Sequence, residues 1–210
     1  FYAHLFVEHP EFRTLFPASM DQQREHFVRA LAYVFDNLNN DDRVEPFLQQ
    51  LGRDHRKHGV NGSHFRAGGS ALISAFRNFA GNELWTDEVE AAWHETLACI
   101  TDNMAVAADS DELPPYWGAT IVEHHRVLDD LAIIRLQLDE GIHYFPGQYV
   151  SVQIPQRPKL WRYLSPAIPC NAQGEIEFHV RRVSGGWVSP AMVAESVVGD
   201  RWAISPPLGG

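Results

Sequence analysis

His55 is one of 11 histidines, and it lies in a segment that suits an imidazole ligand of iron. It closes the segment Leu51-Gly-Arg-Asp-His55, on what we expect to be a short helix that follows Pro46-Phe47-Leu48. A haem iron needs a neutral imidazole on one face, held by a helix and surrounded by a largely apolar pocket. His58, three residues further on, shares nearly the same helix face and is the competing candidate. The apolar spacing to Phe65 favours His55.

Three segments later in the chain contain residues that suit a phosphate-bearing cofactor. They are Phe145-Pro-Gly-Gln-Tyr149, Arg162-Tyr-Leu-Ser165 and Gly185-Gly-Trp-Val-Ser189. In the last of them, glycines followed by Ser189 stand where a helix is expected to start. The exposed N–H groups and the dipole of such a helix both attract an anion. Each segment alone is a weak motif.

The elements that must position these residues differ between the two halves of the chain. Ten of the 13 prolines follow residue 113, and apolar residues before that point recur at helical spacing. The first such stripe follows Ser19, an acceptable helix cap. The stripes are Phe27, Leu31, Val34 and Phe35; Phe65, Leu72, Ile73 and Phe76; and Val89, Trp93, Leu97, Ile100 and Met104. This pattern predicts an all-α first half.

The second half is predicted to be an antiparallel β-barrel. An acidic stretch closed by proline, from Asp109 to Pro115, ends the last helix and is typical of a linker. Short segments rich in β-branched and alternating residues follow, separated by glycine and proline turns. They are residues 119–123, 131–138, 148–154 and 175–180.

Composition restricts the classes of function. The net charge of -10 and the absence of a dense basic cluster argue against nucleic acid as the main partner. No apolar run is long enough to predict a membrane span. Cys99 and Cys170 lie far apart, which favours reduced thiols and a cytoplasmic location. The start, Phe1-Tyr2-Ala3-His4, is typical of the middle of a helix and predicts a fragment.

The order of motifs in the first half resembles that of flavohemoglobins. The matching segments are Phe1-Tyr2, Glu8-His-Pro-Glu-Phe12, Leu15-Phe16, Asp21-Gln-Gln-Arg-Glu25 and the His55 segment. The resemblance implies an all-α globin followed by an antiparallel β-barrel FAD-binding domain of the ferredoxin-reductase type. It divides the chain into a globin domain (1–108, first helix missing), a linker (109–117) and the FAD-binding domain (118–210). A C-terminal NAD(P)H-binding domain would be absent.

The resemblance also implies roles for individual residues around haem b. Tyr2 matches the distal tyrosine that donates to bound oxygen, and Gln23 matches the distal-helix glutamine. Phe16 matches the phenylalanine that packs on the haem, and Phe27 shares a helix face with Gln23. His55 matches the proximal ligand of the iron.

Around FAD, the resemblance assigns the strand Arg162-Tyr163-Leu164-Ser165 and Tyr149. Arg162 would pair with the diphosphate and Ser165 with the flavin ring, while Gly186 and Ser189 would seat the diphosphate. Leu164 stands where the family usually has an aromatic residue against the flavin. If the segment is a strand, the side chain of Tyr163 points to the opposite face, so we expect that it cannot simply substitute.

The residues around the proximal histidine depart from the family pattern as well. Phe65 occupies the position of a tyrosine that hydrogen-bonds near the histidine, and the matching glutamate position falls near Asp109 or Ser110. Asp54 replaces a lysine usually found beside the ligand. Without a polarising partner the imidazole donates less electron density to the iron.

The activity that the resemblance implies is that of a nitric oxide dioxygenase. In such enzymes NAD(P)H reduces FAD, FAD reduces the haem, and nitric oxide and O2 are converted to nitrate. Because Phe65 and Leu164 alter both cofactor environments, two alternatives stay open. One is a flavohemoglobin that oxidises another small reductant, and the other is a haem-based oxygen carrier or redox sensor.

Overall fold

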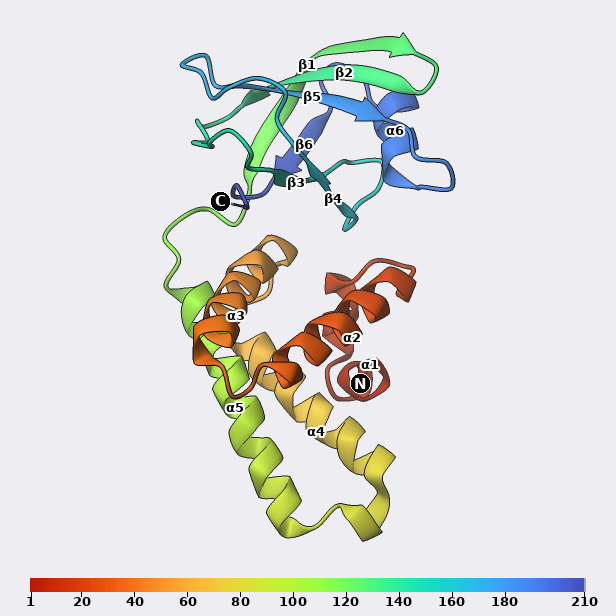
Figure 1. The fold of residues 1–210 in the computed structure, drawn as a ribbon. Helices are drawn as coiled ribbons and strands as arrows, with labels where there is room; N and C mark the ends of the chain where they lie inside the picture. Colours follow the sequence, from red (N-terminus) through yellow and green to blue (C-terminus); the bar gives the residue numbers. More distant parts are fainter. Residues whose placement is uncertain (210) are drawn as a thin grey trace. The chain divides into compact units, whose positions relative to one another are not determined.

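The computed structural model describes residues 1–209. The chain forms two compact units, and the division falls between Glu112 and Leu113. The first unit is helical and the second is built on an antiparallel sheet (Figure 1). Within the described residues, no helix is both long and apolar enough to cross a membrane.

The helical unit contains five α-helices and two 3-10 turns. They are α1 (Tyr2–Glu8), η1 (Pro10–Leu15), α2 (Asp21–Asp36), α3 (Asp41–His55), η2 (Arg56–His58), α4 (Gly62–Leu84) and α5 (Asp87–Asp109). The long helices α4 and α5 lie side by side, with α3 packed on α5 and α1 packed on α4 (Figure 1).

Side chains cap the two long helices at their N-termini. The Asn61 side chain accepts a hydrogen bond from the Ser63 N–H, and the Thr86 hydroxyl accepts one from the Val89 N–H. Such caps satisfy N–H groups that have no partner within the helix. Ser19 is not the cap of α2, contrary to expectation. The N-cap residue is Met20, and the Ser19 hydroxyl donates to the Asp21 carboxylate instead.

The helix that carries His55 begins earlier than the sequence suggests. It starts at Asp41, with Asp41 and Asp42 in its first turn, so Pro46 lies inside α3 rather than before it. Acidic residues in a first turn favour helix initiation because they face the positive end of the helix dipole. The resulting helix is long enough to run across α5.

Gly52 sets the distance between α3 and α5. A Cβ added at Gly52 would lie within 2.3 Å of the backbone oxygen of Met104, so only glycine fits there. The adjoining core contains Val34, Val44, Leu48, Phe65 and Met104. The helix that ends at His55 is therefore held against the backbone of α5.

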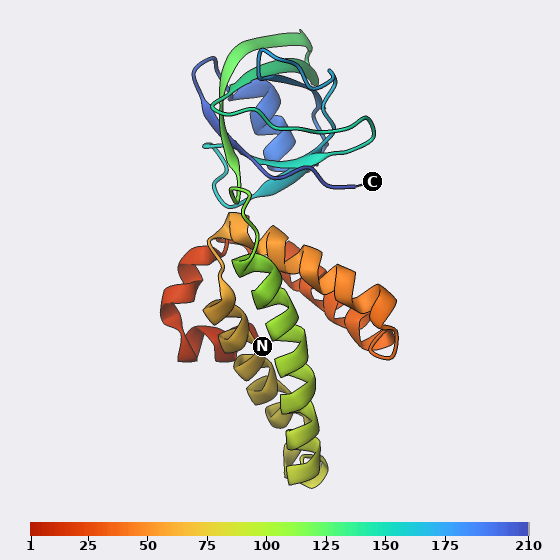
Figure 2. The same cartoon turned by 90° about the vertical axis from the view of Figure 1, so that its left-hand side faces the viewer.

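The described part of the second unit is a six-stranded antiparallel sheet, which Figure 2 shows to be strongly curved. Its strands follow the spatial order β4-β3-β6-β1-β2-β5. They are β1 (Trp117–Leu128), β2 (Leu131–Leu138), β3 (Val150–Gln153), β4 (Trp161–Leu164), β5 (Glu175–Arg181) and β6 (Arg201–Ile204). Helix α6 (Val188–Ala194) contributes to the core and packs on β5 and β2.

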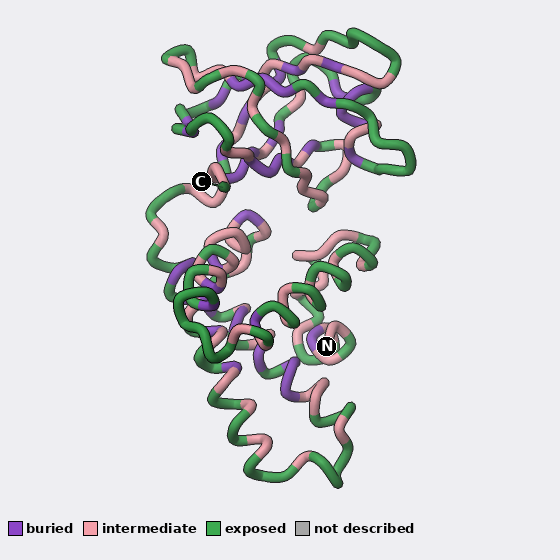
Figure 3. Tube along the Cα trace, in the orientation of Figure 1, coloured by how far each residue is buried: buried purple, intermediate pink, exposed green. Residues whose placement is uncertain are grey.

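The cores of the two units differ in how completely they are buried, and Figure 3 colours the chain by burial. In the sheet unit the core is closed, and Phe178, Trp202 and Ile204 are at most 2% exposed. In the helical unit Phe1, Phe27 and other rings are only partly buried against their core. Half-buried aromatic side chains leave apolar surface that a planar apolar group could cover.

The substitution Gly52→Ala tests the packing of α3 on α5. We expect a loss of about 1–3 kcal/mol in the free energy of unfolding of the helical unit, because the new methyl group forces the helices apart. Chemical denaturation followed by circular dichroism measures it. Gly68→Ala is the matched control, since no atom lies within 4 Å of a Cβ there. The control should be neutral or stabilising by up to about 1 kcal/mol, and equal stability of both variants would contradict the packing argument.

Candidate functional site

The imidazole of His55 is oriented by the helix that carries it. Its Nδ1 lies 2.7 Å from the carbonyl oxygen of Leu51, one turn earlier in α3. Because a carbonyl only accepts, Nδ1 must carry the proton and donate. The lone pair is then on Nε2, which has no hydrogen-bond partner among the described residues. This is the arrangement that a metal-ligating imidazole needs.

Burial keeps the histidines of this segment neutral at pH 7. It lowers the pKa of His55, which the Leu51 carbonyl opposes in part. Burial, with the neighbouring Lys57 and His55, lowers the pKa of His58 to about 4. Both rings are thus in the form that can ligate a metal, and their centroids lie 6.4 Å apart. Charge state alone does not distinguish the two candidates.

Phe65 packs against His55 and gives it an apolar wall. The two rings meet nearly edge to face, with centroids 5.5 Å apart, and Phe65 is buried. The carboxylates nearby are engaged elsewhere. Asp109 accepts from the Gly62 N–H at 3.2 Å, at the start of α4, and Asp54 pairs with Lys57 at 2.6 Å. Among the described residues, the polar partner of His55 is a backbone carbonyl rather than a carboxylate.

Three of the expected distal residues form one aromatic cluster. The ring of Tyr2 lies 5.6 Å from that of Phe16 and 5.7 Å from that of Phe27, centroid to centroid. Phe1 stacks on Phe27 at 4.5 Å, and Phe6 lies 5.3 Å from Phe16. The sequence analysis assigned no role to Phe1 or Phe6, although the spacing of Phe6, four residues after Tyr2 on α1, could have indicated it.

The hydroxyl of Tyr2 is placed to donate a hydrogen bond. It lies 3.5 Å from the carbonyl oxygen of Gln23, so α1 and α2 bring the two predicted distal residues together. Burial raises the pKa of Tyr2 above its ordinary value. The phenol therefore stays protonated at neutral pH and remains a donor.

These residues fit a haem better than a metal ion bound by side chains alone. The described residues contain no group of three or more His, Cys, Asp or Glu side chains that could share a metal. A single imidazole with an unengaged Nε2 needs a prosthetic group to supply the remaining ligands. The half-buried aromatic cluster supplies the apolar contact surface for such a group.

The predicted flavin-binding segment is the edge strand β4. Arg162, Tyr163 and Leu164 lie on it, and Ser165 follows it at the surface. Burial lowers the pKa of Arg162, whose Nη1 donates to the Trp161 carbonyl at 2.8 Å. Tyr149, just before β3, pairs through its backbone with Leu208, and its ring lies 5.2 Å from that of Tyr163. β3 and β4 thus bring two predicted residues, Tyr149 and Tyr163, into contact.

The glycine segment forms a tight turn that leads into α6. Gly185 has a φ of +74°, which glycine adopts without strain. The Gly186 N–H donates to the Val183 carbonyl, and the Ser189 hydroxyl accepts from the Val183 N–H, each at 3.0 Å. The hydroxyl of Ser189 therefore holds the shape of the turn.

Arg157 is a residue near this turn that the sequence did not reveal. Its Nε donates to the Trp187 carbonyl at 3.2 Å, and its guanidinium pairs with Glu195 at 2.6 Å. The interaction fixes the loop between β3 and β4 to the glycine turn. No local motif marks Arg157, because its position depends on the pairing of strands.

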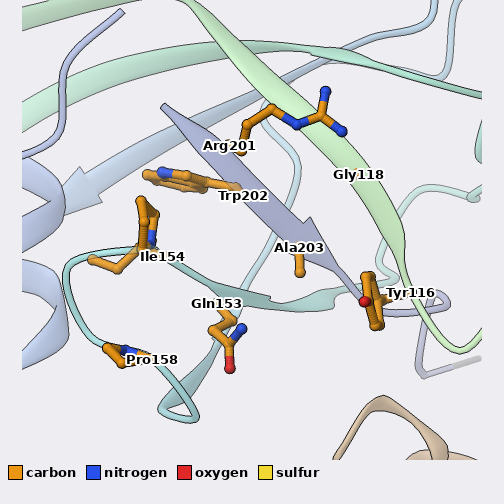
Figure 4. Close-up of a pocket in the computed structure, with 9 residues that line it drawn as sticks. Tyr116, Gly118, Gln153, Ile154, Pro158, Arg201, Trp202 and Ala203 are labelled. Atoms are coloured by element: carbon orange, nitrogen blue, oxygen red, sulfur yellow. The ribbon is translucent and has the colours of Figure 1, made fainter. Parts of the chain in front are cut away.

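A surface hollow of about 330 Å³ lies elsewhere on the sheet unit (Figure 4). Gly118, Ala203 and Gln153 form part of its lining, with Tyr116 at one end and Arg201 at the other. Arg201 pairs with Asp139. None of the residues singled out from the sequence lines this hollow, so it does not contribute to the candidate sites.

Comparison with known proteins assigns each unit to a family. The chain matches the globin family over residues 1–104 and the oxidoreductase FAD-binding domain family over residues 118–210. The chain is a globin followed by an FAD-binding oxidoreductase domain, which is the organisation of flavohemoglobins. The globin family implies haem as a cofactor, and the FAD-binding family implies FAD.

Individual relatives have the same two-part organisation. A flavohemoprotein of Bacillus anthracis is 30% identical over 73% of this chain and 41% of its own length. One of Bordetella parapertussis is 26% identical over 100% of this chain and 57% of its own. A solved flavohemoglobin from Malassezia yamatoensis matches 100% of this chain and 58% of its own, with a TM-score of 0.73 at 15% identity, which supports the fold. The chain thus spans roughly half the length of these relatives.

Replacing each histidine in turn tests which one is the proximal ligand. His55→Ala should abolish the absorption spectrum of histidine-ligated haem, because it removes the imidazole whose Nε2 is unengaged. His58→Ala should largely preserve that spectrum. Reconstitution with haem followed by absorption spectroscopy measures both variants, and the reverse result would exclude His55.

The lowered pKa of His58 predicts how stability depends on pH. A histidine whose pKa falls on folding binds fewer protons in the folded state, so unfolding takes up a proton as the pH falls. The free energy of unfolding of the haem-free chain should therefore decrease from about pH 6.5 to about pH 4. Denaturant titrations across this range should show a shallower slope for His58→Gln than for His26→Gln, which alters an exposed residue. Equal slopes would contradict the burial of His58.

Proposed function

We propose that this chain is the haem- and flavin-binding part of a nitric oxide dioxygenase. The overall reaction would join nitric oxide and O2 to form nitrate, with one electron from NAD(P)H delivered through FAD. The observation that carries the proposal is a globin with Tyr2 beside Gln23 and an unengaged His55 Nε2, followed in the same chain by an FAD-binding domain. A globin that only stores oxygen has no need of an attached flavin domain. Covalent fusion of the two raises their effective concentration for electron transfer.

On the proximal side, His55 would hold the haem iron through Nε2. The hydrogen bond from Nδ1 to the Leu51 carbonyl fixes the ring plane and the tautomer. Phe65 excludes water from one side of the imidazole. Gly52 keeps the helix close to α5, so the ligand has little freedom to shift.

On the distal side, the Tyr2 hydroxyl would exchange its long hydrogen bond to the Gln23 carbonyl for one to a diatomic ligand, because it has a single proton to donate. A hydrogen bond of this kind is stronger to a ligand that carries partial negative charge than to a neutral ligand. Gln23 lies beside Tyr2 and would orient the phenol, while Phe16 and Phe27 hold its ring in place. When bound, haem supplies the iron on which the two gases react, and FAD supplies electrons one at a time.

In the sheet unit, Arg162 would neutralise the FAD diphosphate, and the glycine turn at Gly186 would receive it. Ser189 and Arg157 shape the turn and fix it to the neighbouring loop. Ser165 follows β4 and is exposed, so its hydroxyl is available to the flavin ring.

One observation favours a second candidate function. Phe65 packs on the imidazole and the Nδ1 proton goes to a backbone carbonyl, so no carboxylate pushes electron density toward the iron. A less electron-rich iron suits either the oxidation of another small reductant or an oxygen carrier or redox sensor. The flavin unit favours the first of these.

A single-turnover experiment separates the candidates without the need for NAD(P)H. The haem-loaded chain is chemically reduced, equilibrated with O2, and mixed rapidly with nitric oxide while the haem absorption band is recorded. A dioxygenase should reach the ferric form within milliseconds and yield stoichiometric nitrate. Tyr2→Phe should react more slowly, because the distal donor is lost. Slow oxidation without nitrate in the parent chain would reject the dioxygenase proposal in favour of the second candidate.

A further inference from the structure

The pairing of β4 with β3 determines which of its side chains face the core. Leu164 pairs with Val150, Tyr163 with Ser151 and Arg162 with Val152. Paired residues on antiparallel strands place their side chains on the same face. Val150 and Val152 are fully buried, so Leu164 and Arg162 lie on the core-facing side of the sheet. Leu164 packs against the core cluster accordingly.

Tyr163 is on the other face and is 63% exposed. Its ring meets Tyr149 nearly edge to face, with an interplanar angle of 82°. Tyr149 is itself held in position. Its backbone pairs with Leu208, and its ring lies so close to Gly209 that a Cβ there would approach to 3.1 Å. The edge of the sheet therefore presents a pair of tyrosines, in which the ring of Tyr149 is fixed and the ring of Tyr163 is largely exposed.

We propose that Tyr163, supported by Tyr149, provides the aromatic surface on which the flavin ring stacks, in place of Leu164. The inference rests on the proposed FAD site at β4 and names the residue that contacts the ring there. Leu164 is partly buried against the core cluster and has no flat face to offer. A phenol ring with more than half its surface exposed matches a planar heterocycle in shape and polarity.

The edge position of β4 makes this arrangement compatible with Arg162. β4 is the outermost strand on its side of the sheet, so a ligand lying along the open edge can reach side chains from both faces. The flavin ring can then lie on Tyr163 while the diphosphate meets the Arg162 guanidinium. The aromatic side chain, Tyr163, lies one residue before the usual aromatic position, Leu164. The stacking surface is therefore on the other face of the edge strand, and the strand itself is unchanged.

FAD titration of the whole chain tests the proposal. Tyr163→Leu should weaken FAD binding by about tenfold and change the visible circular dichroism of the bound flavin, because the stacking surface is lost. Tyr163→Phe keeps a ring of the same size and should bind FAD to within about twofold of the parent. Tyr116→Leu is the matched control, since Tyr116 is also an exposed tyrosine of the sheet unit, at 47%.

Three outcomes would count against the inference or its basis. If Tyr163→Leu binds FAD like the parent while Arg162→Ala binds it weakly, the flavin site is correct and Tyr163 is not its stacking residue. If Tyr116→Leu weakens FAD binding as much as Tyr163→Leu does, the effect is not specific to the Tyr149–Tyr163 pair, and the inference fails. If the parent chain itself does not bind FAD, the proposed function and the inference fail together.

Discussion

The hydrogen bond from His55 Nδ1 to the Leu51 carbonyl determines most of what the helical unit can do. It decides the tautomer, directs Nε2 away from the helix and fixes the ring plane within one turn of α3. Its acceptor is neutral, so the imidazole gains orientation without gaining much basicity. A carboxylate in that position would give a more electron-rich iron. Here the two aspartates considered from the sequence, Asp54 and Asp109, are committed to Lys57 and to the start of α4.

The sheet unit is subject to a different constraint, because it must bind a large cofactor although its core has no room for one. Its interior is filled by aliphatic and aromatic side chains, so the binding groups must stand at the edge and on loops. Arg162 and Tyr163 are on the edge strand, and the glycine turn precedes α6. The pair Arg157–Glu195 ties one loop to the other and reduces the number of independent segments that binding must order.

The sequence predicted the architecture well because both units follow strong periodic patterns. β2 occupies the predicted range 131–138, and α5 ends at Asp109, as the acidic, proline-closed stretch indicates. The residues at which α2 and α3 begin were harder to predict. Ser19 satisfies a side chain rather than a helix N–H, and Pro46 is tolerated in an early turn of a helix that Asp41 begins.

Among the site residues, sequence motifs pointed to groups recognised by local spacing, such as Tyr2, Gln23 and His55, whose roles stay predictions. They assigned no role to Phe1, Phe6 or Arg157, because those roles depend on which elements come together in space. The alternation of a strand correctly separated the faces of Tyr163 and Leu164. It could not show that the usual aromatic position, now Leu164, faces the core, because that depends on pairing with Val150 and Val152.

The close approach at Gly52 couples the movement of α3 to that of α5. α3 has no compressible side-chain layer between its backbone and that of α5 at this point, and Arg56, next to His55, pairs with Asp111 at 2.8 Å just beyond the end of α5. A shift of α5 along its axis would therefore move α3 and displace the imidazole of His55 directly. We therefore expect α3 and α5 to move as one body, so that a force on the chain after α5 would displace Nε2 of His55, the proposed iron ligand.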